Sequence, residues 1–147
     1  WKRQISATKK HHQKIITMTD HFETVKNYLY ELDFVIEQQN ETDGILVVSH
    51  EDDGISKLVI GVVEPLLIFE QFLFNLPEDA KEVHKSLLMK NREVVHGAFA
   101  LDETGTKVIY RDTLQVENLD MNELAGTLNA LKLLLSEYAE EIIKLSK

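Results

Sequence analysis

The chain has 147 residues, 44% of them hydrophobic and 28% charged, which is the composition of an ordinary globular protein and excludes a wholly disordered or collagen-like chain. No apolar run reaches the roughly 20 residues that a membrane-spanning helix needs, so we do not expect a membrane protein. The chain has no cysteine. This excludes a disulfide scaffold, a thiolate nucleophile and Cys-ligated zinc, and it favours a reducing compartment such as the cytoplasm.

Charge is distributed unevenly along the chain. The formal net charge of −9 comes from 16 basic and 25 acidic residues, but residues 1–17 hold five basic residues and no acidic one, so the remainder has a net charge of −14. A domain this acidic repels phosphate backbones and anionic lipid head groups, and we expect neither nucleic acid nor a membrane as partner. We predict that residues 1–17 are a basic tail, either a leader or an added extension, with a native arm as the alternative. Residues 18–147, which begin at Met18, are predicted to form a single domain.

The first half of the domain is predicted to contain one helix followed by strands. Four apolar residues recur at the three- and four-residue spacing of an amphipathic helix over 20–32: Phe22, Val25, Leu29 and Leu32. Alternating residues predict strands over 34–38 and 45–49. The unbroken β-branched run over 58–63 is typical of a central strand that is covered on both faces. The apolar segment 66–74 fits either a strand or a helix.

The second half begins with a helix and a hairpin. We predict a helix over 77–91, started by a capping box in which Asn75 precedes Glu78 by three positions. Two strand-like runs, 94–101 and 107–114, are separated by a short acidic loop that contains a glycine. This arrangement predicts an antiparallel pair.

The C-terminal segment carries the strongest helical pattern in the chain. Asp120 and Glu123 form a second predicted capping box. Apolar residues then recur at spacings of three and four: Leu124, Leu128, Leu131, Leu135, Tyr138, Ile142 and Leu145. We predict one continuous helix of about 25 residues, roughly 37 Å long. The order of elements contains no βαβ unit, so we predict an α+β fold. In this fold an antiparallel sheet has the order α-β-β-β-α-β-β-α, and the long C-terminal helix packs on the sheet.

Patterns that would carry chemistry are weak or missing. The two acidic turns lack the glutamate that a calcium-binding EF-hand needs at its twelfth position, and the common nucleotide-binding, hydrolase and zinc-protease motifs do not occur. His96 would suit a general base, and Glu64 with Glu70 a carboxylate pair, but a partly buried histidine and solvated or salt-bridged carboxylates are the commoner situations. Gly97 indicates a bulge or the close approach of another backbone. We predict no catalytic residue, no metal site and no cofactor.

Three segments of the C-terminal half form a distinctive combination: KNREVVHGAFALDETG at 90–105, VIYR at 108–111 and LDMNEL at 119–124. Together they resemble the YbjN-like relatives of the type III secretion chaperones, a bacterial group whose members are described as Tir chaperones or CesT-like. The hairpin GAFALDETG ahead of a leucine-rich C-terminal helix is the most specific part. The resemblance extends over residues 18–147, and the predicted order of elements agrees with that of the family.

The resemblance implies a small acidic cytoplasmic protein, usually a homodimer, that holds a segment of a client protein on apolar patches and performs no chemistry. We therefore expect partner-binding residues on the first helix, at Val25 and Leu29, and in the apolar segment, at Phe72 and Phe74. Ordinary core packing is the alternative for each. The surplus of apolar residues over 66–76 favours a homodimer as well. The alternative function is a small-molecule-binding or regulatory domain, which would need polar groups that meet in a pocket.

Overall fold

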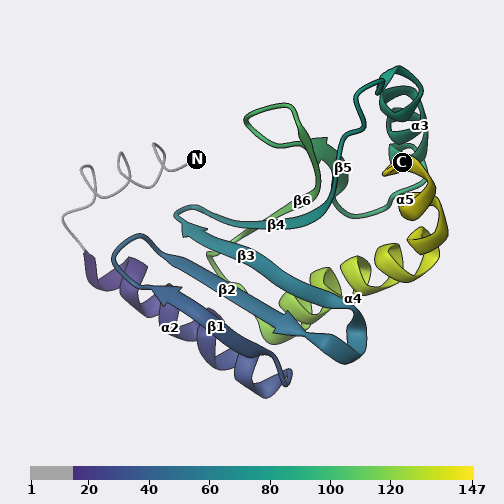
Figure 1. Ribbon diagram of the computed structural model, residues 1–147. Coiled ribbons are helices and arrows are strands. Elements are labelled where there is room, and N and C mark those ends of the chain that lie inside the picture. Colours follow the sequence, from purple (N-terminus) through teal and green to yellow (C-terminus); the bar gives the residue numbers. More distant parts are fainter. Residues whose placement is uncertain (1–14) are drawn as a thin grey trace.

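The structure, a computed structural model, describes the backbone of residues 15–147 and the side chains from residue 21 onward. Its elements are α2 (Ile15–Glu31), β1 (Val35–Asn40), β2 (Ile45–His50), the 3-10 turn η1 (Glu51–Asp53), β3 (Ile55–Val63), β4 (Leu66–Asn75), α3 (Lys81–Asn91), β5 (Ala98–Leu101), β6 (Lys107–Gln115), α4 (Met121–Glu137) and α5 (Ala139–Leu145) (Figure 1). The predicted α+β fold is confirmed, and the ambiguous segment 66–74 is a strand. The helix α2 begins at Ile15, so it includes the last residues of the basic tail predicted over 1–17. The other residues of that predicted tail lie outside the part of the chain that the structure describes.

All six strands form one sheet in the order β1-β2-β3-β4-β6-β5, and every neighbouring pair is antiparallel. The long strands β3, β4 and β6 occupy the middle, while β1 and the four-residue β5 are the edges. Because directly paired residues share a face of an antiparallel sheet, the register separates an inner face from an outer face.

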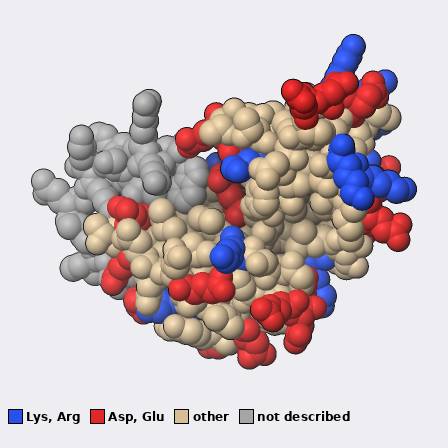
Figure 2. All heavy atoms as spheres, viewed as in Figure 1, with Lys and Arg blue, Asp and Glu red and all other residues tan. Residues whose placement is uncertain are grey.

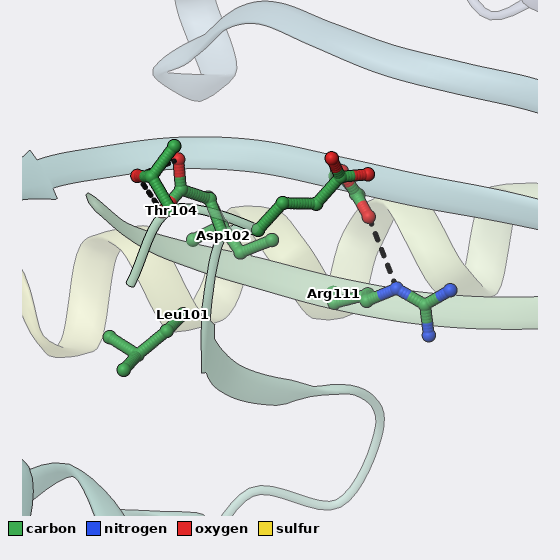
Figure 3. A pocket seen from close by; sticks show the side chains of 7 residues that line it. Leu101, Asp102, Thr104 and Arg111 are labelled. Atoms are coloured by element: carbon green, nitrogen blue, oxygen red, sulfur yellow. Dashed lines mark hydrogen bonds and ion pairs between the residues drawn. The ribbon is translucent and has the colours of Figure 1, made fainter. Parts of the chain in front are cut away.

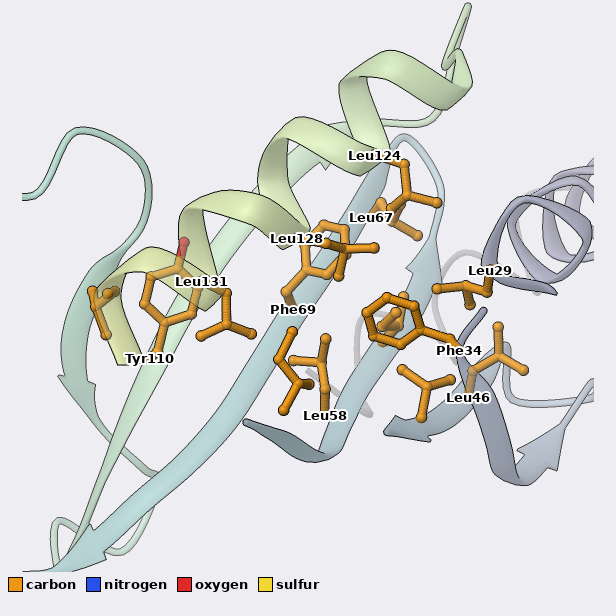
Figure 4. Packing of buried hydrophobic residues seen from close by; sticks show 14 of the residues in the cluster. Leu29, Phe34, Leu46, Leu58, Leu67, Phe69, Tyr110, Leu124, Leu128 and Leu131 are labelled. Atoms are coloured by element: carbon orange, nitrogen blue, oxygen red, sulfur yellow. The ribbon is translucent and has the colours of Figure 1, made fainter. Parts of the chain in front are cut away.

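The inner face of the sheet packs against α2 and α4 and holds the main hydrophobic core (Figure 4). Residues from both helices and from the central strands meet there and are buried, among them Phe22, Leu29, Leu58, Ile60, Leu67, Phe69, Tyr110, Leu124 and Leu131. Burying one such aliphatic or aromatic side chain stabilises a fold by about 1.5–3 kcal/mol. The apolar stripes predicted for the first and last helices are therefore the surfaces that cover the sheet.

The C-terminal helix begins as predicted but is not continuous. The Asp120 side chain accepts a hydrogen bond from the backbone N–H of Glu123 at 2.8 Å, as in the predicted capping box. The helix α4 ends at Glu137, and Tyr138 leaves helical geometry with φ −103° and ψ 10° before α5 begins. The ring of Tyr138 packs edge-on against Phe99 of β5, with ring centroids 5.6 Å apart. This contact between distant segments accompanies the interruption, and the prediction of one unbroken helix is wrong.

The helix predicted over 77–91 begins later, at Lys81. Asn75 is the last residue of β4, where it pairs with Lys107 of β6, and the residue before the helix, Ala80, makes no side-chain cap. The capping box from Asn75 to Glu78 is therefore wrong. It fails because pairing with β6 holds Asn75 in the strand, and that pairing is not visible in the local sequence.

The strand predicted over 94–101 is shorter than expected, because only Ala98–Leu101 pairs with β6. Residues 92–97 form a loop instead, and His96 is exposed on it, not partly buried in a strand. Gly97 has φ +73°, and a Cβ atom placed there would lie 2.5 Å from the ring of Tyr110. The predicted close approach at Gly97 is real, but the neighbour is an aromatic ring rather than a backbone.

Candidate functional site

The four predicted partner-binding residues occupy two different environments. Val25 and Leu29 of α2 and Phe74 of β4 are buried in the inner-face core. Only Phe72 reaches the surface, with 47% of its area exposed. For the three buried residues this burial favours the alternative of ordinary core packing. A partner-binding role stays a prediction for Phe72 alone.

Phe72 belongs to the outer face of the sheet, opposite α2 and α4. It pairs with Ile109 of β6, which in turn pairs with Ala100 of β5. Lys107 places its ammonium group 5.6 Å from the centre of the Phe72 ring, within the range of a cation–π contact. This corner of the outer face therefore presents an exposed aromatic ring beside aliphatic side chains.

The outer face carries a second apolar cluster further along the strands. Val63 and Ile68 are buried there, and Ile45 and Leu66 pack against them. All four come from strands, and Ile45, Gly61 and Ile68 lie in one paired row across β2, β3 and β4. The solvated face of an antiparallel sheet is ordinarily polar, so an aliphatic cluster on this face is unusual for a sheet that only needs one core.

A shallow pocket of about 630 Å³ lies beside this face, at the β5–β6 hairpin (Figure 3). Its charged side chains already have partners. The Arg111 Nε donates to Glu70 Oε2 at 3.1 Å, so Glu70 is in a salt bridge, which is the commoner of the situations considered for it. Asp102 accepts hydrogen bonds from the Thr104 hydroxyl and from two backbone N–H groups of the hairpin loop. The bonds to Asp102 hold the hairpin loop together, and the Glu70–Arg111 salt bridge joins β4 to β6.

The surroundings of Asp102 shift the pKa of its carboxyl group. Desolvation raises that pKa, but the hydrogen bonds from Thr104, Lys107 and Thr106 outweigh it, and the pKa of Asp102 lies below its ordinary value of 3.8. A carboxyl that stays ionised at neutral pH is a good turn acceptor and a poor general acid.

A second groove, of about 230 Å³, runs between α3 and the edge strand β5. It is lined mainly by apolar groups from Leu87, Leu88, Phe99, Ala100 and Leu101. On the same helix Leu88 is 72% exposed and its neighbour Met89 is 65% exposed. None of these residues was predicted from the sequence to bind a partner.

An acidic depression of about 580 Å³ lies at the other edge, where β1 meets the turn η1. Asp33, Glu37, Glu51 and Asp52 contribute carboxylates to it. Within the part of the chain that the structure describes, however, no group of three or more His, Asp or Glu side chains is placed to hold a metal ion.

The distribution of charge leaves a broad uncharged area. In the view of Figure 2 an uncharged area lies to the right of a few charged groups at the centre, while carboxylates gather along the lower edge and both signs of charge meet at the upper right. Among the described helices, none has the length and apolar content that crossing a membrane requires.

The comparisons with known proteins agree with this architecture. The CesT_Tir_1 family model matches residues 18–147. The structure resembles Escherichia coli YbjN, described as a putative transcription regulator, with 12% identity, a TM-score of 0.60 and coverage of 81% of this chain and 91% of that chain. It also resembles a chain of the heterodimeric ExoU–SpcU complex from the type III secretion system of Pseudomonas aeruginosa, with 18% identity, a TM-score of 0.60 and coverage of 82% and 96%.

A third similar structure is that of the Yersinia pestis type III secretion chaperone SycH in complex with a stable fragment of YscM2, with 16% identity, a TM-score of 0.52 and coverage of 86% and 99%. At these identities the likeness concerns the fold. A search of curated protein sequences returns no match.

Proposed function

The chain belongs to the CesT_Tir_1 family and has the fold of the type III secretion chaperones. From that premise we propose that it holds a segment of a client protein on the outer face of its sheet. The carrying observation is the apolar character of this face, with Phe72 exposed beside Ile109 and the separate cluster around Ile68. It is a binding surface without chemistry, and it acts in the cytoplasm.

The charge of the domain selects the kind of client. An acidic surface around apolar patches attracts basic, amphipathic segments and repels anionic ones. Added salt should therefore slow association, while the apolar contacts persist once the complex has formed. The chaperone–fragment complex of SycH supports this proposal, because a protein of the same fold is seen there with a piece of another protein.

We also propose that the protein is a homodimer, through the groove between α3 and β5. The apolar surplus over 66–76 does not support the expected homodimer, because Leu67, Phe69 and Phe74 are buried in the core of the chain. The exposed Leu88 and Met89 on α3 supply apolar surface that a second copy would cover. Light scattering at tens of micromolar should then give twice the chain mass, and Leu88→Glu should halve it; a monomeric wild type contradicts this part.

The client surface is tested with Phe72→Glu. Phe72 is half exposed, so the variant should fold, and its circular dichroism should match that of the wild type. Photo-crosslinking in a bacterial lysate followed by peptide mapping identifies the captured segment, and calorimetry with that synthetic segment gives its affinity.

We expect Phe72→Glu to weaken binding of the segment. Tyr30→Glu should leave it unchanged, because Tyr30 is a similarly exposed aromatic residue that lies on α2. If both variants bind as the wild type does, or if no segment is captured by any of them, the client-holding function is wrong. Saturable binding of a small metabolite at the pocket around Glu70 and Arg111 would instead support the small-molecule alternative.

A further inference from the structure

A third apolar surface lies where α4 meets α5, on elements that take no part in the outer sheet face. A groove of about 190 Å³ separates loop 92–97 from these helices. We call it the elbow groove, and its principal lining residues are Glu93, Val95, Leu133, Leu134, Glu137 and Tyr138. Its size is below the roughly 300 Å³ at which small-molecule sites begin, so it suits one or two side chains rather than a metabolite.

Two aliphatic side chains of the groove are unusually exposed. Val95 on the loop is 87% exposed and Leu133 on α4 is 64% exposed, whereas Leu134 and Tyr138 between them are buried. Leu133 is not part of the helical seam that covers the sheet. Neither residue contributes to the core, so their apolar surface has no use within the described fold.

The loop that carries Val95 is held in a defined conformation. The Asn91 side chain accepts a hydrogen bond from the backbone N–H of Phe99 at 2.7 Å and donates one to its carbonyl at 3.0 Å. The Tyr110 hydroxyl donates to the carbonyl oxygen of His96 at 3.0 Å. These contacts bracket Val95 on both sides along the chain. A surface that is ordered beforehand loses less conformational entropy when a partner binds.

The rim of the elbow groove is acidic. Glu93 and Glu137 stand at its two sides, and none of the residues that line it is Lys or Arg. The Tyr138 hydroxyl donates to Glu93 at 3.4 Å. Burial raises the pKa of Tyr138, and the neighbouring carboxylates of Glu137 and Glu93 raise it further. The groove therefore combines apolar walls with a local negative potential.

We propose that the elbow groove binds a cationic amphipathic segment of a partner protein. One aliphatic or aromatic side chain of the segment enters between Val95 and Leu133, and flanking Lys or Arg residues approach Glu93 and Glu137. A buried anchor surrounded by charge-assisted contacts is the usual arrangement of a strong peptide contact. The elbow groove shares no residue with the outer-face surface around Phe72, so this inference does not depend on the proposed client site.

The test uses a short synthetic helical peptide in which leucines occupy one side and lysines the other, titrated into the full chain labelled on its methyl groups. We expect saturable shifts at the methyl groups of Val95 and Leu133. Leu133→Glu and Val95→Glu should each weaken the peptide by about tenfold. Ile143→Glu is the matched control, since Ile143 is exposed on α5 but does not line the groove, and it should leave the affinity unchanged.

A scrambled peptide of the same composition separates shape from bulk charge. Equal binding of both peptides, or equal affinity for wild type and both groove variants, overturns the inference. The inference is also overturned if the peptide fails to bind the wild type and Leu133→Glu converts a dimer to a monomer in light scattering. In that case a second copy of the chain occupies the elbow groove. Loss of peptide binding in Phe72→Glu but not in Leu133→Glu would place the peptide on the outer face instead.

Discussion

Replacing Gly97 by alanine tests how loop 92–97 is held against the sheet. Gly97 has φ +73°, where an alanine pays about 1–2 kcal/mol for left-handed backbone. Its Cβ would also lie 2.5 Å from the Cζ and hydroxyl oxygen of Tyr110. The ring cannot swing away easily, because Tyr110 is fully buried and its hydroxyl is hydrogen-bonded to His96.

The cost of Gly97→Ala is the sum of backbone strain and overpacking, less a smaller gain from the unfolded chain. Overpacking of a filled site costs about 1–3 kcal/mol, and an alanine restricts the unfolded chain by about 0.4–1 kcal/mol in favour of folding. The expected loss is therefore about 1–4.6 kcal/mol of unfolding free energy. For a domain of this size that lowers Tm by roughly 2–18 °C.

Gly105→Ala provides the matched control. Gly105 has nearly the same φ, +72°, but nothing lies within 4 Å of the added Cβ, so only the strain remains. Urea unfolding followed by circular dichroism should show Gly97→Ala losing about 1–3 kcal/mol more than Gly105→Ala. In a Tyr110→Leu background this difference should shrink, because the contacting ring atoms are gone. Equal losses for the two glycines in the native background would refute the role of the Tyr110 ring.

Three further substitutions probe the core, the hairpin and the loop. Leu131→Asp should unfold the domain, because an unpaired buried charge costs about 3–5 kcal/mol. Leu133 is exposed on the same helix, so Leu133→Asp should leave Tm unchanged. Similar Tm values for the two variants would mean that Leu131 does not face the core. Asp102→Asn should destabilise the domain at neutral pH. Because the pKa of Asp102 is lowered in the folded protein, the difference in unfolding free energy between variant and wild type should close as the pH falls below 3.8. Urea unfolding in acid that shows a constant difference would contradict this. Tyr110→Phe should cost about 0.5–1.5 kcal/mol through its lost hydrogen bond. Burial, and after it the Asp112 carboxylate, raise the pKa of Tyr110. The wild type should therefore keep its greater unfolding free energy up to pH 10 and lose it only as the pH rises further. A difference from Tyr110→Phe that vanishes below pH 10 would contradict the role of this hydrogen bond.

The sequence alone determined the elements whose signals are local. The apolar stripe of α2, the cap at Asp120 and the acidic loop of the β5–β6 hairpin were all predicted, because helical and strand periodicities and short-range hydrogen bonds involve residues close together in the chain. The resemblance to the CesT-like family likewise rested on contiguous segments, and the family match over residues 18–147 confirms it.

The tertiary structure decided which apolar residues are accessible, and Phe72 and Phe74 show why. Strict alternation along a strand would put both on one face of the sheet. A register shift in the pairing of β4 with β6 between these residues turns Phe74 into the core and leaves Phe72 on the outer face. That shift depends on β6, a strand more than thirty residues further along the chain. In the same way, the interruption of the last helix accompanies a contact between Tyr138 and the distant Phe99. Because pairing and packing between distant segments set both features, local sequence patterns named Phe72 and Phe74 together but could not tell the exposed residue from the buried one.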